Sequence, residues 1–177
     1  MRRWTVLVLF LIIGTTFLGC ATTGQQSELI LNEEYFQVAH REIQNAKESI
    51  YLISYLFLLY DYQDAYSNRL LNDLIEAHNK GVDVRVILEY PKPEYMKEEG
   101  PENQKAYEKL REAGIDVRFD SAERTTHNKV LIIDRETIIV GSHNYTFDGL
   151  KYNNEVSLLL KDREKAEELI KYFKQIH

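Results

Sequence analysis

The sequence predicts an α/β fold in which a mixed β-sheet lies between helices. Apolar segments of strand length alternate with segments whose apolar residues recur every three to four positions, and two β-α-β units are visible in this pattern. Strands then follow one another directly, which adds antiparallel pairing to the sheet. About 150 residues follow the N-terminal segment, enough for one domain with a substantial core.

The first half of the domain alternates strand and helix. The predicted elements are a strand at 29–31, a helix capped by Asn32, a strand at 50–59, a helix at 65–80, a strand at 82–88, a helix at 102–113 and a strand at 115–119. The run at 50–59 is almost continuously apolar, as expected of a central strand that is covered on both faces. Gly81 and Gly114 follow the two later helices, where a left-handed cap is usual.

The second half of the domain begins with a β-hairpin. The predicted elements are strands at 129–133, 137–140 and 155–160, followed by a helix that Asp162 caps. The closing helix buries a side formed by Ala166, Leu169, Ile170 and Phe173. Residues 91–101 contain all three prolines and are expected to form an exposed surface loop.

The N-terminus has the pattern of a bacterial export signal. Two arginines precede an uncharged stretch from Trp4 to Leu18, which is shorter than the roughly 20 residues of a membrane-spanning helix. Gly19-Cys20 resembles a lipoprotein processing site, so we expect a signal peptide at 1–19, a lipidated Cys20 in a flexible tether at 20–27, and the domain at 28–177. The alternative is an uncleaved membrane anchor. Both alternatives place the domain outside the cytoplasm, in the cell envelope.

Composition excludes several kinds of protein. Cys20 is the only cysteine, so the chain cannot form an intramolecular disulfide or a cysteine-based zinc site. The net charge of -6 argues against a generic polyanion binder. Binding of any nucleic acid to this acidic chain therefore requires a local strip of basic side chains. Candidates are Arg118, Arg124, Lys129 and Lys151, with Arg85 and Lys92 as further members. The alternative is that these are ordinary surface charges.

A cluster of polar residues within eighteen positions indicates chemistry at phosphate. It comprises His127-Asn128-Lys129, Asp134 and Gly141-Ser142-His143-Asn144. Because side chains two apart on a strand share a face, His127 and Lys129 point together, as do Ser142 and Asn144. An imidazole, an ammonium, a hydroxyl and an amide would then converge on one tetrahedral anion. Zinc bound by His127, Asp134 and His143 is an alternative, although His143 should face away from Ser142 and Asn144.

The spacing H-x-K-x4-D-x6-G-S-x-N resembles the signature of the phospholipase D superfamily, whose members are phosphodiesterases. The resemblance implies that His127, Lys129, Asp134 and Glu155 are catalytic, and that Lys129, Ser142 and Asn144 bind phosphate. Glu155 would bond the imidazole of His127 and fix its tautomer. Asp134 sits at the predicted hairpin turn and would support the site rather than act on substrate.

In this family two such motifs form one active site, and single-motif chains dimerise. The resemblance therefore implies a homodimer without a metal or another cofactor, in which one His127 attacks phosphorus and the other protonates the leaving group. Three functions remain open: an endonuclease acting on DNA or RNA, a phospholipase D acting on membrane phospholipid, and a catalytically silent lipoprotein that binds anions.

Overall fold

The computed structural model describes residues 26–91 and 103–177. Its elements are β1 (Gln26–Leu31), α1 (Glu34–Asn45), β2 (Ser49–Ser54), α2 (Tyr66–Asn79), β3 (Asp83–Leu88), α3 (Gln104–Glu112), β4 (Asp116–Phe119), β5 (Lys129–Ile133), β6 (Thr137–Gly141), α4 (Phe147–Lys151), β7 (Val156–Lys161) and α5 (Arg163–Phe173). The strands form one sheet in the order β1-β7-β6-β5-β2-β3-β4. β2, β3 and β4 are parallel, whereas β5, β6, β7 and β1 pair antiparallel.

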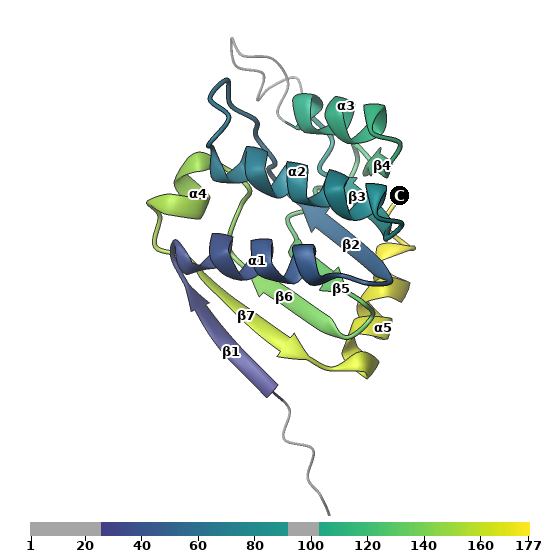
Figure 1. Ribbon diagram of the computed structural model, residues 1–177. Helices are drawn as coiled ribbons and strands as arrows, with labels where there is room; N and C mark the ends of the chain where they lie inside the picture. Colours follow the sequence, from purple (N-terminus) through teal and green to yellow (C-terminus); the bar gives the residue numbers. More distant parts are fainter. Residues whose placement is uncertain (1–25, 92–102) are drawn as a thin grey trace, which may run out of the picture.

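Helices cover both faces of the sheet, as the sequence predicts. α1 and α2 lie side by side on one face (Figure 1), over a core that includes Ile50, Leu52 and Leu131. α5 packs on the opposite face against Ile53 and Ile132. The central strand β2 is buried at all six positions, which explains its continuous apolar sequence. The predicted mixed α/β architecture is confirmed.

Several predicted boundaries differ from the structure. The strand predicted at 50–59 ends at Ser54, because the chain then leaves the sheet and Phe57 makes only an isolated bridge to Tyr145. Asn32 is not the N-cap of α1; the cap position is Glu33, and the Asn32 side chain accepts a hydrogen bond from Glu155 N–H at 3.0 Å. The short helix α4 was not predicted, because five residues are too few to show helical periodicity.

The remaining helix ends agree with the sequence. Gly81 and Gly114 have φ angles of +94° and +84°, in the left-handed region that favours glycine. Asp162 caps α5 by accepting the N–H of Lys165 at 3.0 Å.

The N-terminal predictions fall largely outside the structure. The signal peptide and Cys20 precede the described residues, as does most of the tether, whose last two predicted residues form the start of β1. Most of the predicted loop at 91–101 also lies outside them. Within 26–91 and 103–177, no helix has the length and apolarity needed to cross a membrane.

Strand pairing brings distant parts of the sequence to one edge of the sheet. Lys129 pairs with Ser54, so the start of β5 lies at the carboxyl end of β2. Gly141 pairs with Ser157, which adds the end of β6 and the start of β7 to the same edge. Sites in α/β sheets commonly form at the carboxyl ends of parallel strands. The candidate residues that precede β5 or follow β6 therefore meet here.

Candidate active site

His127 and Lys129 lie together at this edge, as predicted from their spacing. Tyr55 N–H donates to Asn128 O at 3.1 Å, which continues the β2–β5 ladder past the end of the strand. His127 and Lys129 project to one face, and the Asn128 amide points the other way, to the Tyr172 hydroxyl on α5 at 3.0 Å. The Nζ of Lys129 is 3.3 Å from Nδ1 of His127 and 2.9 Å from its carbonyl oxygen.

Tyr55 forms an aromatic wall behind both groups. Its ring centroid is 4.3 Å from that of His127, and Lys129 Nζ lies over the ring at 4.7 Å. Desolvation lowers the pKa of Lys129, opposed by the charge of Glu155. The pKa of His127 is also lowered from 6.5, first by desolvation and then by the charge of Lys129. A neutral imidazole beside an ammonium is what an attack on an anionic phosphodiester requires.

The backbone just before His127 is fixed by a buried carboxylate. Glu89 follows β3 at the same edge, and its Oε2 accepts the N–H of Thr126 at 2.5 Å. Glu89 N–H is itself bonded to Ser54 O at 3.1 Å, so the carboxylate is anchored to β2. Glu89 and Thr126 are both buried. This hydrogen bond fixes the backbone of the residue that precedes His127.

Ser142 and Glu155 are bonded to each other. The Ser142 hydroxyl donates to Oε2 of Glu155 in a short hydrogen bond and accepts the N–H of Val156 at 3.1 Å. The other oxygen of Glu155 accepts from Asn153 Nδ2 at 3.3 Å. In the described chain Glu155 is therefore bonded to Ser142 and Asn153, not to His127 as the family resemblance implies.

Asn144 and Gly141 complete this part of the edge. Asn144 Oδ1 is buried and has no hydrogen-bond partner among the described residues. At Gly141 a Cβ atom would lie 2.4 Å from the Cα of Ser157 and 2.4 Å from the carbonyl oxygen of Val156. Glycine is thus required here by the close approach of β6 to β7.

His143 faces away from Ser142 and Asn144, as its position in the alternation predicts. It is fully buried and stacks on Tyr35 with ring centroids 4.4 Å apart. Nε2 lies 2.9 Å from Asn32 O and Nδ1 lies 2.7 Å from Ser157 Oγ. Because a carbonyl only accepts, we assign the proton to Nε2. Burial lowers the pKa of His143, which favours this neutral state.

Asp134 lies at the opposite end of β5 from Lys129, about 16 Å away along the strand. Its Oδ1 accepts N–H groups from Lys47 at 3.0 Å, Glu48 at 2.7 Å and Ser49 at 3.1 Å. The carboxylate ties the β5–β6 turn to the segment before β2. Asp134 is therefore not in contact with the other candidate catalytic residues, and its bonds are structural.

The three proposed zinc ligands are not brought together. His127 and Asp134 flank opposite ends of β5, and both ring nitrogens of His143 are hydrogen-bonded, to Asn32 and to Ser157. In the part of the chain that the structure describes, no group of three His, Cys, Asp or Glu side chains is placed to hold a metal ion.

The predicted basic strip is divided between the two faces of the sheet. Arg118 and Arg85 lie on the α5 face, where Arg118 donates to Phe173 O and Arg85 pairs with Asp83. Lys129 alternates with Val130, which packs under α5, and so points to the other face. Lys151 belongs to α4, and Lys92 lies outside the described residues.

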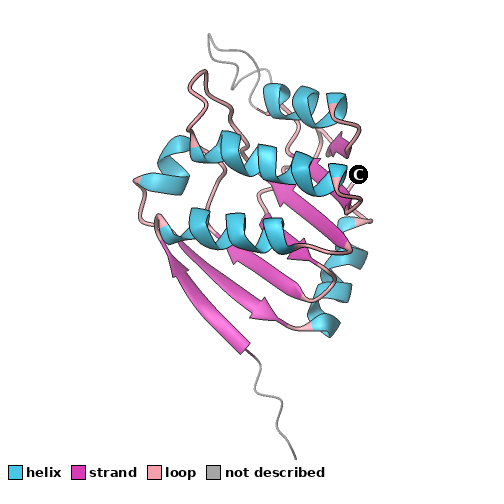
Figure 2. Cartoon of the chain, in the orientation of Figure 1, coloured by secondary structure: helices cyan, strands magenta, loops and turns pink. Residues whose placement is uncertain are grey.

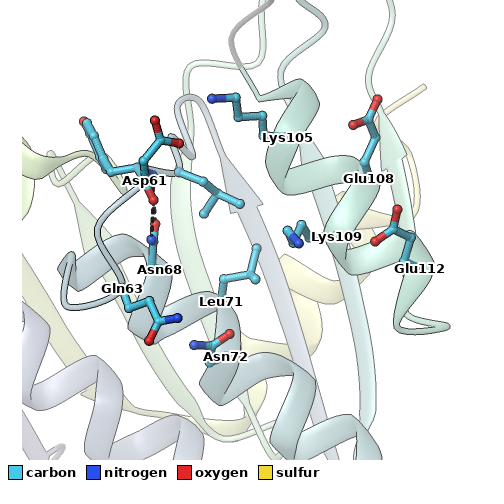
Figure 3. Close-up of a pocket in the computed structure, with 11 residues that line it drawn as sticks. Asp61, Gln63, Asn68, Leu71, Asn72, Lys105, Glu108, Lys109 and Glu112 are labelled. Atoms are coloured by element: carbon cyan, nitrogen blue, oxygen red, sulfur yellow. Dashed lines mark hydrogen bonds between the residues drawn. The ribbon is translucent and has the colours of Figure 1, made fainter. Parts of the chain in front are cut away.

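A cavity of about 630 Å³ lies away from these residues, between α2, α3 and the loop that precedes α2. Figure 3 shows Lys105 and Lys109 of α3 across from Asn68 and Leu71 of α2. Glu108, Glu112 and Asp61 also line it, so its charge is mixed. None of the candidate phosphate-binding residues contributes to this cavity.

Two residues at the edge were not identified from the sequence. Tyr55 lies inside the strand predicted at 50–59, and Glu89 falls between the strand predicted at 82–88 and the loop predicted at 91–101. Their signal was positional, since each directly follows a buried parallel strand at the edge where such folds bind ligands.

Known proteins share this fold and part of this sequence. The family model described as "Cardiolipin synthase, PLD-like domain" matches residues 40–177. Phospholipase D of Rickettsia prowazekii (strain Madrid E) is 37% identical over 128 residues, which are 72% of this chain and 55% of that protein. Mitochondrial cardiolipin hydrolase of Mus musculus is 33% identical over 113 residues, which are 63% of this chain and 48% of that protein. The chain thus spans about half the length of these curated relatives.

Among solved structures, the fold is similar to that of Nuc, a phospholipase D family member from Salmonella typhimurium. The TM-score is 0.70 at 21% identity, covering 85% of this chain and 94% of that chain. NucT from Helicobacter pylori gives a TM-score of 0.64 at 18% identity, covering 86% of this chain and 95% of that chain. At these identities the likeness establishes the fold alone.

Proposed function

This chain belongs to the phospholipase D superfamily, and we propose that it is a metal-independent phosphodiesterase that cleaves DNA or RNA outside the cytoplasm. The observation that carries the proposal is the contact of His127 with Lys129 against Tyr55, at 3.3 Å between Nζ and Nδ1. A nucleophile and a cation for phosphate are adjacent there, and neither requires a metal ion.

The proposed reaction has two steps at phosphorus. In the first, a ring nitrogen of His127 attacks, so that a P–N bond forms while the P–O bond to the leaving alkoxide breaks. A second, protonated imidazole gives its proton to that alkoxide. In the second step the now neutral imidazole takes a proton from water, the resulting hydroxide attacks phosphorus and the P–N bond breaks. Lys129 balances the charge on the phosphoryl oxygens, and the Asn144 amide supplies further donors. Ser142 donates to phosphate only once its hydroxyl has turned away from Glu155.

We infer that the second imidazole comes from another copy of the chain, because the full spacing H-x-K-x4-D-x6-G-S-x-N occurs once in this sequence. His78-Asn79-Lys80 repeats only its first three positions, at the end of α2. We therefore propose a homodimer with the two His127 residues meeting across a two-fold axis. An apolar surface beside the site supports this assembly. Four apolar side chains are exposed on the α5 face of the sheet, in the part that α5 does not cover. The exposed fractions are 67% for Leu29, 49% for Leu31, 40% for Val140 and 50% for Val156.

The position of this surface fits a second copy. Leu31 pairs with Val156, and Val156 follows Glu155 directly, so the apolar face runs up to the site. Large apolar patches on soluble domains usually mark an interaction surface. The patch faces the α5 side of the sheet and His127 projects to the other side, so the proposed two-fold axis passes close to the sheet edge at Val156, where the two sides meet.

Hydrolysis of membrane phospholipid is the second candidate function. Relatives such as the Rickettsia prowazekii protein are named phospholipase D, and others are named mitochondrial cardiolipin hydrolase. Export and lipidation at Cys20 would also hold the domain at a membrane, and we propose this envelope location for either activity. Mass spectrometry of the membrane-extracted protein should find Cys20 as a lipidated N-terminus; an intact Met1 would contradict lipidation.

An activity panel separates the two substrates. Wild type and His127→Ala would be incubated at one salt concentration with single-stranded DNA, plasmid DNA, RNA, phosphatidylcholine vesicles and cardiolipin vesicles. Cleavage of nucleic acid by wild type and not by His127→Ala is the expected result. Release of head groups without nucleic-acid cleavage would favour the phospholipase, and no turnover on any substrate would reject both activities.

A further inference from the structure

Aromatic side chains gather beside the candidate active site, on α4 and on the loop before α2, which lie next to each other in Figure 2. We call Tyr60, Tyr62, Phe147 and Tyr152 the aromatic platform; their ring centroids lie 5.2 to 6.1 Å apart in contacting pairs. Tyr62 and Tyr152 are 46% and 63% exposed. Four contacting rings with two open to solvent form a patch, whereas single exposed aromatics are ordinary.

The platform is held in place before any ligand binds. The Tyr60 hydroxyl accepts the N–H of Phe147 at 3.0 Å, which ties the loop to the start of α4. The Asn68 side chain clamps the backbone of Tyr60, accepting its N–H at 3.0 Å and donating to its carbonyl at 2.7 Å. A surface that is already ordered loses little entropy when a ligand binds, which favours affinity.

The platform is joined to the segment that carries Asn144, one of the proposed phosphate-binding residues. Tyr145 N–H donates to Leu56 O and Leu58 N–H donates to Tyr145 O, both at 2.9 Å, so the loop and the segment after β6 run together. Phe147 follows Asn144 by three residues, which limits their Cα separation to about 11 Å. A ligand on the platform therefore lies within a few nucleotides of a phosphate at the site.

We propose that the aromatic platform stacks the bases of a single-stranded nucleic acid while one of its phosphates occupies the site at His127 and Lys129. This inference rests on the proposed function and specifies its substrate. Tyr62 and Tyr152 offer open ring faces, and every base has a π-face to match. Lys151 Nζ lies 5.7 Å from the Phe147 ring centroid and 5.4 Å from that of Tyr152, where it can meet a neighbouring phosphate.

The charges around the platform favour bases over a lipid surface. Asp61, Asp64 and Asp148 are exposed around the platform, and among the described residues Lys151 is the cation that lies over its rings. Protein surfaces that insert into membranes carry Lys and Arg around their aromatic residues, which attract anionic lipid. Insertion here would press three carboxylates into the head groups. Base stacking leaves those carboxylates in water and leaves phosphate contacts to Lys129 and Lys151.

The test measures binding and turnover separately. Binding of a fluorescent single-stranded oligonucleotide would be titrated in the His127→Ala background, which prevents cleavage, with and without Tyr62→Ala and Tyr152→Ala combined. The matched control is Tyr62→Phe with Tyr152→Phe, which keeps the rings. A second probe is an abasic strand of equal length and charge. Turnover of bis(4-nitrophenyl) phosphate, which is too small to reach the platform, is measured with His127 intact.

The alanine pair should weaken oligonucleotide binding by about 10-fold or more, and the phenylalanine pair by less than about 2-fold. The abasic strand should bind with about equal affinity to the alanine pair and to the phenylalanine pair. Turnover of the small diester and binding to phosphatidylglycerol vesicles should not change. Unchanged oligonucleotide affinity in the alanine pair, or a loss confined to vesicles, overturns the platform. If wild type does not hydrolyse the small diester, the proposed catalysis fails, while the binding titration still decides the platform.

Discussion

Asp134→Ala should destabilise the fold without impairing catalysis. The change removes the acceptor of three backbone N–H bonds, from Lys47, Glu48 and Ser49, at 2.7 to 3.1 Å. Hydrogen bonds to a charged group contribute about 1.5–3 kcal/mol each, and water replaces part of this at a half-exposed turn. We therefore expect a loss of about 3 kcal/mol in the free energy of unfolding. For a domain of this size that lowers Tm by about 6 to 12 °C.

Thermal unfolding by circular dichroism measures the loss, and kcat/KM is measured well below the lowered Tm. Asp162→Ala is the matched control, because it removes the acceptor of one N–H bond, from Lys165, and should cost about 1 kcal/mol. Turnover by folded Asp134→Ala should stay within about 2-fold of wild type, since Lys129 lies about 16 Å away along β5. An unchanged Tm with turnover as low as that of His127→Ala would refute the structural assignment of Asp134.

Three further predictions concern the site and the assembly. EDTA should leave turnover unchanged, because no step uses a metal ion; loss of turnover that added zinc restores would contradict this. The pKa of His127 is lowered partly by the charge of Lys129, so Lys129→Met should raise it, and NMR titration of the imidazole should move to higher pH. A shift to lower pH would mean that the two groups do not interact as described. Leu29→Glu with Leu31→Glu places charge on the uncovered sheet face and should give an inactive monomer by sedimentation; an active dimer would place the interface elsewhere.

Much of the fold was predictable because its signals are local. The apolar run in β2 and the glycines after α2 and α3 reflect burial and backbone conformation, which depend on nearby residues. The end of β2 was not predictable, because Tyr55 and Leu58 are as apolar as the strand before them. Only the pairing of that segment with Asn128 and Tyr145 decides where the sheet ends.

The candidate site divides in the same way. The placement of His127 and Lys129 on one face followed from alternation along a strand. The orientation of the His143 side chain, away from Ser142 and Asn144, followed in the same way. The partner of Glu155 did not follow, because Ser142 reaches it only through the β6–β7 register. Glu89 was also missed, since its contact with Thr126 joins residues from separate parts of the chain. Contacts across strands depend on tertiary packing, which spacing along the chain does not contain.

Subunit mixing tests the central proposal, that two copies of His127 form one site. Wild type and His127→Ala would be mixed in equal amounts, allowed to exchange, and assayed on a nucleic-acid substrate. If both imidazoles are needed, only wild-type homodimers turn over, and activity falls to about a quarter of that of the same total protein as wild type. Activity of about half, in proportion to the wild-type fraction after exchange is verified, would contradict the shared site.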